Sequence, residues 1–306
     1  MSRSRPAEVS GILVLNKHEG VTSHHMISIC RRLFNTTQVG HTGTLDPMAT
    51  GVLPILIGRA VKASEYVMAG EKRYIAGMRL GLTTDTEDST GTVLTRCETL
   101  PDSTEVMAVC EKFVGKIMQI PPMYSAIKVG GQKLVDLARE GKEVDREPRE
   151  VEIAALHCTP TDKPDEYTLD VTCSKGTYIR TLCADIGAAL GCGAVMSSLV
   201  RVRSGGYTID QAYTVAQLEE MTYEERLTLP KPVETLFTDL PEVHLADFHA
   251  KLIRGGTELY QKKIRTHLDE PGQLVRLYHK DEFFALGRTD VIDGNPVIRP
   301  EKLFVL

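Results

Sequence analysis

The sequence predicts an α+β fold, in which a mixed, largely antiparallel sheet forms the main domain and a small β-rich module follows it. Helical and strand-like hydrophobic patterns are interspersed without a strict β-α-β repeat, which argues against a doubly wound parallel sheet. Beyond residue 240 the pattern changes to one short helix and several short strands. A chain of 306 residues is long enough for two domains on the usual scale of about 100 to 200 residues each.

The first elements follow the order strand, turn, helix, strand. Residues 11–17 (GILVLNK) form an apolar run typical of a buried strand, and residues 72–82 alternate between apolar and other side chains, as in a half-buried strand. Residues 83–91 (TTDTEDSTG) are expected to form a solvated acidic turn. Between the two strands, Ser23 is a candidate helix N-cap. The apolar residues that follow at helical spacing are Met26, Ile27, Cys30, Leu33 and Phe34.

The second half contains two helices and two more alternating strands. Asp102 and Glu105 have the spacing of a capping box, which predicts the start of a helix. Residues 149–158 (REVEIAALHC) and 167–173 (YTLDVTC) alternate as strands do. The helix predicted after them has an apolar face formed by Ile179, Leu182, Cys183, Ile186 and Leu190.

A proline-containing segment marks the expected domain boundary. Residues 229–241 (LPKPVETLFTDLP) have the composition of a linker. We therefore expect a main domain over residues 1–240 and a β-rich module over residues 241–306.

Charge limits how this chain could bind nucleic acid. Its formal net charge is −5, which excludes a protein that holds polyanions by bulk positive charge. Residues 1–80, however, contain ten Lys/Arg and five Asp/Glu, whereas residues 81–170 contain ten and eighteen, so a local basic face is compatible with the acidic total. The sequence has no apolar run of membrane-spanning length and no signal-peptide core, so we expect a cytoplasmic protein without membrane association.

The cysteine and histidine patterns do not indicate a metal site. The seven cysteines are odd in number and include no CxxC pair, which argues against a zinc ribbon and a disulfide framework. The neighbours His24 and His25 are not accompanied by an HExxH motif.

The segment GHTGTLDPMATG, residues 40–51, is the strongest candidate for a functional loop. Its glycines allow tight turns, and Pro47 disfavours helical geometry at Asp46, so a carboxylate is presented from a rigid loop. The loop lacks the GK[ST] ending of a P-loop, the GxGxxG fingerprint and any basic residue, so chemistry on nucleotide phosphates is not supported. From these residues alone, a turn with a solvated or capping aspartate is the favoured interpretation.

Six segments occur in the same order as segments of a known enzyme family. They are NKHEGVTSHHMI, VGHTGTLDPMATGVLPILIGRAVK, KRYIAGMRLG, IPPMYSAIKVGG, SKGTYIRTL and LVRVRSG. In these segments the chain resembles the TruB family of tRNA pseudouridine synthases from about residue 11 to residue 210. Beyond residue 245 it is more weakly similar to the PUA module at the end of many bacterial members.

The resemblance implies an isomerase that converts the uridine at position 55, in the T-arm of tRNA, into pseudouridine. This reaction breaks the C1′–N1 glycosidic bond and rejoins the uracil through C5 without redox change, so no cofactor is expected. By family match, Asp46 is the catalytic carboxylate, and attack on C1′, addition to C6 and removal of a sugar proton are all open to it. Arg180 matches the arginine that pairs with this carboxylate and would keep it ionised despite burial.

The same resemblance implies roles for five further residues. Tyr74 matches the tyrosine that stacks on the target uracil, while Tyr178 and Leu199 match residues that line the pocket. His41 matches a histidine that fills the space left by the extruded base. Lys17 matches a basic position whose role is either structural or directed at phosphate.

The expected RNA partner is a folded tRNA. Extrusion of the uridine costs a few kcal/mol, and an aromatic stacking contact returns about 1 to 3 kcal/mol. The C-terminal module would contact another part of the tRNA, by analogy the acceptor end, and no obligate protein partner is expected. A second hypothesis is a non-catalytic RNA-binding protein on the same scaffold, but the combination of Asp46, Tyr74 and Arg180 favours the enzyme.

Overall fold

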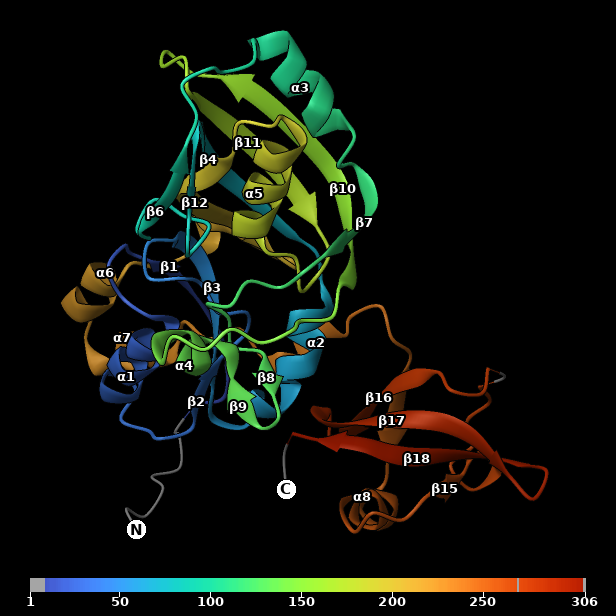
Figure 1. The fold of residues 1–306 in the computed structure, drawn as a ribbon. Helices are drawn as coiled ribbons and strands as arrows, with labels where there is room; N and C mark the ends of the chain where they lie inside the picture. Colours follow the sequence, from blue (N-terminus) through green and yellow to red (C-terminus); the bar gives the residue numbers. More distant parts are fainter. Residues whose placement is uncertain (1–8, 269, 305–306) are drawn as a thin grey trace.

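The computed structural model describes residues 9–268 and 270–304, in which a nine-stranded sheet forms the centre of the main domain (Figure 1). The strand order is β1-β3-β12-β4-β11-β10-β7, with β2 paired to β3 and β13 paired to β12. Neighbouring strands are antiparallel except for β3 and β12, which run parallel. The predicted α+β fold with a mixed, largely antiparallel sheet is therefore confirmed. The strands are β1 (Gly11–Lys17), β2 (Val39–His41), β3 (Thr50–Ile57), β4 (Lys72–Leu80), β7 (Gly115–Gln119), β10 (Arg149–Pro160), β11 (Glu166–Cys173), β12 (Ala194–Ser204) and β13 (Tyr207–Thr208).

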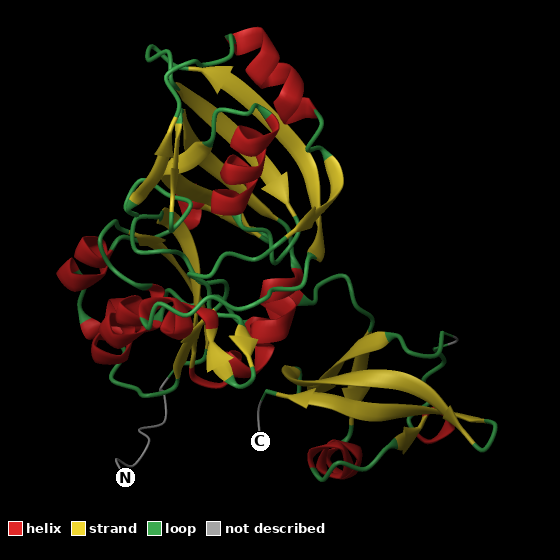
Figure 2. Ribbon diagram, in the orientation of Figure 1, coloured by secondary structure: helices red, strands yellow, loops and turns green. Residues whose placement is uncertain are grey.

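Helices cover the sheet in two groups, which Figures 1 and 2 show at opposite ends of the main domain. One group, α3 and α5, packs with β4, β10, β11 and β12 around one apolar cluster. The other contains α1, which packs with β1, β2, β3 and α6 around a second cluster. The helices are α1 (Ser23–Leu33), α2 (Ser64–Ala69), α3 (Ser103–Glu111), α4 (Leu134–Arg139), α5 (Ile179–Ala189), α6 (Val215–Glu220), α7 (Tyr223–Leu227) and α8 (Asp247–Arg254).

Short elements complete the main domain. Two small hairpins pair β5 with β6 and β8 with β9, and the second hairpin precedes α4 in the insertion after β7. Their bounds are β5 (Leu82–Thr84), β6 (Val93–Arg96), β8 (Lys128–Val129) and β9 (Gln132–Lys133). The short 3₁₀ helices are η1 (Gly58–Ala63), η2 (Ile209–Gln211) and η3 (Val233–Leu236), and a fourth, η4 (Gln261–Lys263), lies in the C-terminal module.

The alternation read in residues 72–82 is explained by the position of β4 in the centre of the sheet. Tyr74, Ala76, Met78 and Leu80 are buried in the cluster shared with α5, whereas Arg73 and Arg79 are exposed on the other face. The sequence pattern therefore placed the side chain of Tyr74 on the correct face of its strand.

The helix α1 has a different N-cap from the predicted one. The hydroxyl of Thr22, not that of Ser23, accepts the hydrogen bond from the backbone N–H of His25 at 3.1 Å. Ser23 is buried, and its hydroxyl exchanges hydrogen bonds with the backbone N–H and C=O of Leu45 at 2.9 and 3.1 Å. Two adjacent hydroxyls are equivalent cap candidates in a sequence, and here the second one attaches the 40–51 loop to α1.

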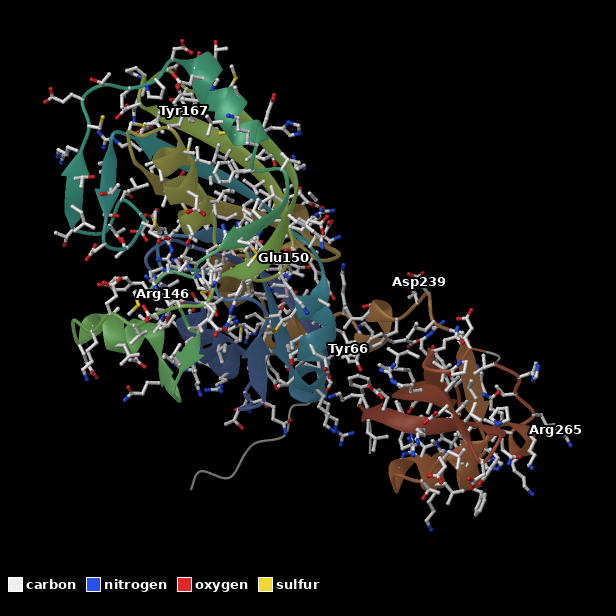
Figure 3. All side chains as sticks on the ribbon, turned by 45° about the vertical axis from the view of Figure 1, so that its right-hand side comes forward. Tyr66, Arg146, Glu150, Tyr167, Asp239 and Arg265 are labelled. Atoms are coloured by element: carbon white, nitrogen blue, oxygen red, sulfur yellow. The ribbon has the colours of Figure 1, made fainter. Side chains whose placement is uncertain are left out.

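Residues 242–303 contain a separate five-stranded sheet of order β14-β16-β17-β18-β15, which packs against α8 around its own apolar cluster. Aromatic rings join it to the main domain: the ring of Phe237 lies 5.0 Å from that of Tyr66 and 6.0 Å from that of Phe304. Figure 3 shows Tyr66 at this junction. The strands are β14 (Glu242–Leu245), β15 (Leu259–Tyr260), β16 (Leu274–His279), β17 (Glu282–Ile292) and β18 (Asn295–Leu303). Among the described residues, no helix has the length and apolarity needed to cross a membrane.

Candidate functional site

Asp46 lies in the loop that joins β2 to β3, next to the first residues of α5. Its backbone carbonyl accepts a hydrogen bond from the N–H of Ala49 at 3.1 Å, which closes a turn around Pro47. The Asp46 side chain is 35% exposed, so the carboxylate is held in the structure yet reachable from outside. The loop thus presents one carboxylate from a rigid turn, as the sequence predicted.

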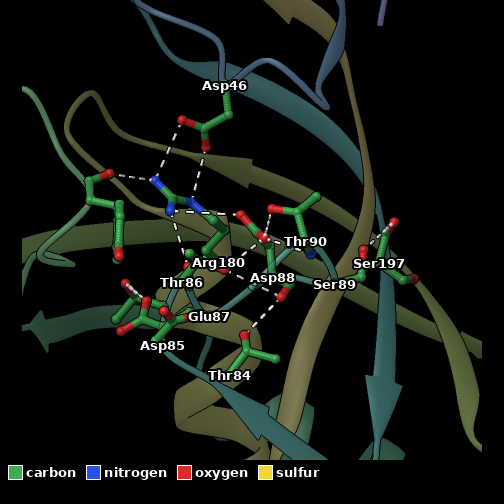
Figure 4. Close-up of polar contacts among 12 residues, drawn as sticks. Asp46, Thr84, Asp85, Thr86, Glu87, Asp88, Ser89, Thr90, Arg180 and Ser197 are labelled. Carbon is green, nitrogen blue, oxygen red and sulfur yellow. Dashed lines mark hydrogen bonds and ion pairs between the residues drawn. The ribbon is translucent and has the colours of Figure 1, made fainter. Parts of the chain in front are cut away.

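Arg180, at the start of α5, pairs with Asp46 through two donors on one edge of its guanidinium (Figure 4). Its Nε lies 3.0 Å from Oδ2 of Asp46, and its Nη2 lies 3.4 Å from Oδ1. The remaining donors bind backbone, since Nη1 donates to the carbonyl of Thr86 at 3.0 Å and Nη2 to that of Tyr124 at 2.9 Å. The side chain is only 5% exposed, so the guanidinium is fixed in orientation and shielded from water.

The acidic turn at 83–91 is not simply solvated, which corrects the prediction. Asp88 is buried, its Oδ1 accepts hydrogen bonds from Thr86 and Thr90, and its Oδ2 lies 3.8 Å from Nη1 of Arg180. Glu87 is half-buried and accepts a hydrogen bond from Thr181. A turn rich in Asp, Glu and Thr has the composition of a solvated loop, and the partner that buries these carboxylates is about 90 residues away in sequence.

The charge state of Asp46 results from opposing effects. Burial raises the pKa of the Asp46 carboxyl, and the neighbouring Asp88 raises it further, whereas Arg180 and Lys17 oppose the rise. The net effect is a pKa above the ordinary value, and the two cations limit this rise and so favour the ionised carboxylate.

Lys17 is fully buried at the end of β1, where its ammonium group binds the backbone of the candidate loop. Its Nζ donates to the carbonyls of His18, Pro47 and Ala49 at 3.0, 3.1 and 2.5 Å. Burial lowers the pKa of Lys17 to about 8, although Asp46 acts in the other direction. Of the two roles that the sequence left open, this arrangement favours the structural one, because the ammonium holds both sides of the turn that carries Asp46.

Tyr74 and Leu199 lie together on the neighbouring strands β4 and β12. Both belong to the apolar cluster that also contains Leu45 from the candidate loop. Tyr74 is 9% exposed, and burial raises the pKa of its hydroxyl. One aromatic and two aliphatic side chains thus pack together next to the loop that carries Asp46.

Tyr178 and His41 lie at the ends of two other elements, Tyr178 before α5 and His41 at the end of β2. Tyr178 is the residue before α5, and its backbone N–H and C=O are both hydrogen-bonded to the side chain of Gln119. His41 ends β2, and its Nδ1 is buried without a hydrogen-bond partner among the described residues. Burial and the nearby charge of Arg201 lower the pKa of His41, which keeps the imidazole neutral at pH 7.

Arg201, on β12, is a second arginine at the site and was not identified as a site residue from the sequence. It is 1% exposed and donates to the carbonyls of Val52 and Gly43 at 2.7 and 2.9 Å. In the sequence it is one basic residue of an alternating strand, which reads equally well as a solvated side chain. Within residues 9–268 and 270–304, no three His, Cys, Asp or Glu side chains lie close enough together to hold a metal ion.

Comparison with known protein families shows which family the chain belongs to. A family model described as "TruB family pseudouridylate synthase (N terminal domain)" matches residues 31–179. A second, described as "tRNA pseudouridylate synthase B C-terminal domain", matches residues 180–238. The chain belongs to the TruB family of pseudouridylate synthases, as its motifs predicted.

Individual relatives carry a more specific name, tRNA pseudouridine synthase B. The chain is 41% identical to the protein of Alkaliphilus oremlandii over 285 residues, which cover 91% of this chain and 93% of the relative. It is 40% identical to that of Francisella philomiragia over 287 residues, with 92% of each chain covered. It is 43% identical to that of Thiobacillus denitrificans over 270 residues, with 88% of each covered.

Solved structures support the fold. A chain of a Cbf5–Nop10–Gar1 complex matches with a TM-score of 0.69 and 25% identity, covering 99% of this chain and 92% of that one. A chain of an H/ACA RNP bound to a substrate RNA containing 2′-deoxyuridine matches with a TM-score of 0.69 and 23% identity, covering 97% and 85%.

Proposed function

We propose that this enzyme isomerises uridine to pseudouridine at position 55 in the T-arm of tRNA, with Asp46 as the nucleophile. The observation that carries the proposal is the bidentate contact between Asp46 and Arg180, with N–O distances of 3.0 and 3.4 Å. A carboxylate beside the sugar acts only while it is ionised, and a desolvated guanidinium at this distance stabilises that form.

The site contains what the reaction needs. The C1′–N1 bond of the uridine breaks, the uracil turns, and a C1′–C5 bond forms, while the proton on C5 is lost and N1 gains one. No electrons are exchanged with another molecule, so the chain's own side chains suffice. Asp46 acts at the sugar or the ring, and the apolar walls formed by Tyr74 and Leu199 hold the uracil while it turns.

Access to the uridine requires base flipping. Tyr74 stacks on the extruded uracil and returns about 1 to 3 kcal/mol of the cost of unstacking it. Tyr178 completes the pocket next to Arg180. The neutral imidazole of His41, with its unpartnered Nδ1, occupies the space that the base leaves in the T-loop.

The chain divides by function at about residue 240. Residues 1–240 form the catalytic domain, and residues 241–306 form a PUA-like RNA-binding domain that contacts the acceptor end of the tRNA. Support comes from the separate sheet β14–β18 with its own apolar cluster. The enzyme works in the cytoplasm, where its tRNA substrate is, and needs no obligate protein partner.

An unmodified T-arm hairpin tests the proposal. The full chain is incubated with the hairpin, and pseudouridine is mapped at nucleotide resolution; a hairpin with cytidine at position 55 is the control. We expect one pseudouridine, at position 55, and none in the control. A product at another uridine, or no product with a chain shown to be folded, would overturn the proposal.

A further inference from the structure

Arg201 is a buried cation without a carboxylate partner. It is among the largest fully buried side chains, at 1% exposed, and no Asp or Glu of the described residues forms an ion pair with it. A buried guanidinium is costly unless its donors are satisfied, and an apolar side chain would fill the same space in the core without that cost. The position therefore requires the hydrogen bonds that an arginine makes.

Those hydrogen bonds connect the two ends of the loop that carries Asp46. Nη2 of Arg201 donates to the carbonyl of Gly43, before Asp46, and Nε donates to the carbonyl of Val52, after it, at 2.9 and 2.7 Å. The guanidinium also lies beside the Tyr74 side chain, which is directly across from Arg201 in the β4–β12 pairing. One planar group with several fixed donors thus contacts the catalytic loop and the stacking tyrosine at once.

The backbone around Arg201 is shaped for this close approach. Gly43 has a φ of +75°, and a Cβ there would lie 3.1 Å from Nη1 of Arg201. Gly51, with a φ of +101°, is paired with Arg201 across β3 and β12, and a Cβ there would lie 2.3 Å from the Arg201 carbonyl. Only glycine readily adopts these positive φ values and also leaves room for Arg201 so close to the backbone. The loop therefore depends on a glycine at each end to pack against Arg201.

We propose that Arg201 is a positioning residue, which holds the 43–52 loop and Tyr74 in a fixed relation so that the carboxylate of Asp46 meets a stacked uracil. The proposal rests on the roles proposed above for Asp46 and Tyr74. Arg201 itself contacts neither the reacting atoms of the substrate nor the carboxylate of Asp46, which is bound by Arg180. Its contribution is therefore to the geometry of the bound reaction and not to RNA affinity.

Single-turnover kinetics on the T-arm hairpin test this role. We compare Arg201→Met and Arg201→Lys with Arg203→Met, a control at the next arginine of the same strand, whose side chain is 38% exposed. We expect Arg201→Met to lower the rate at saturating enzyme at least 30-fold, with the dissociation constant of the hairpin within threefold of wild type. Arg201→Lys should recover part of the rate, because it keeps one donor and the charge, and Arg203→Met should leave the rate unchanged.

A double-mutant cycle with Tyr74→Phe separates positioning from a general effect on folding. If Arg201 acts partly through the Tyr74 hydroxyl, Arg201→Met should cost several-fold less in the Tyr74→Phe background than in wild type. A wild-type rate in both Arg201 variants, or fully additive losses in the cycle, would overturn the proposal. If Arg201→Met does not fold, the same rates are compared with Arg201→Lys in its place. An inactive wild-type chain or an active Asp46→Asn variant would instead contradict the proposed function.

Discussion

The guanidinium of Arg180 lies between two carboxylates, 3.0 Å from Asp46 and 3.8 Å from Asp88, and only Asp46 is reachable from outside. The side chain of Asp46 is 35% exposed, whereas that of Asp88 is 7% exposed. One cation therefore stabilises the accessible carboxylate of Asp46 and is itself held by the buried carboxylate of Asp88.

Removal of Arg180 should shift the pH dependence of the reaction. Because Arg180 opposes the rise in the pKa of Asp46, Arg180→Met should raise that pKa further, so the acidic limb of the pH–rate profile moves to higher pH. At pH 7 we expect the single-turnover rate to fall at least 100-fold, with partial recovery as pH rises. Arg180→Lys, which keeps the charge without the bidentate geometry, is the matched variant. An unshifted acidic limb in Arg180→Met would contradict this account of Asp46.

Asp88→Asn should shift the same limb in the opposite direction. The Asp88 charge raises the pKa of Asp46, so its removal lowers that pKa. The amide oxygen can still accept the hydrogen bonds from Thr86 and Thr90, while the charge near Arg180 is lost. We expect an acidic limb at lower pH and a rate at pH 7 reduced about threefold to tenfold, because Arg180 is held less firmly. A shift to higher pH would be inconsistent with the electrostatics described here.

Lys17→Met should destabilise the protein, because three backbone carbonyls lose a charged donor, at a cost of about 1 to 3 kcal/mol. The pKa of Lys17 is about 8 when folded and near 10.5 in the unfolded chain, so the unfolded chain binds more protons between these values. The contribution of Lys17 to stability therefore increases as pH rises through that window.

Urea unfolding of wild type and Lys17→Met at pH 7 and pH 9.5 measures this effect. We expect a larger stability difference at pH 9.5, whereas Lys175→Met, at an exposed lysine, should show no such dependence. Equal differences at both pH values would contradict a lowered pKa for Lys17.

Gly51→Ala should disrupt the site more than the same change at a less crowded glycine. Both Gly51 and Gly191 have positive φ, +101° and +73°, but a Cβ at Gly51 would lie 2.3 Å from the carbonyl of Arg201, while Gly191 has no heavy atom within 4 Å. Gly191→Ala should cost only the backbone strain, about 1 kcal/mol. Thermal unfolding should therefore show a clearly larger loss of stability for Gly51→Ala. Equal losses would mean that the loop does not depend on this contact.

The sequence predicted the features that local patterns or long motifs encode. The alternation in 72–82 placed Tyr74 on its strand, and the family motifs identified Asp46 and Arg180, which the structure brings together across 134 residues of sequence. The cap of α1 was assigned to Ser23 instead of Thr22, because adjacent hydroxyls differ only in the direction the backbone gives them.

Two site residues were missed for a common physical reason. Asp88 is in a segment with the composition of a solvated turn, and Arg201 is in a strand where an arginine is usually exposed. Their burial depends on partners contributed by distant segments: Arg180 for Asp88, and the carbonyls of Gly43 and Val52 for Arg201. The composition of a segment does not show which distant residues will pack against it. Those contacts appear only in the folded structure.

The most direct test of the central claim compares wild type with Asp46→Asn in a single-turnover assay on the unmodified T-arm hairpin, with RNA binding measured in parallel. The change removes the charge and keeps the size of the side chain. We expect wild type to form pseudouridine at position 55 and Asp46→Asn to form none that is detectable, while hairpin affinity stays within about tenfold, or roughly 1.4 kcal/mol. Turnover by Asp46→Asn at a rate comparable to wild type would contradict it.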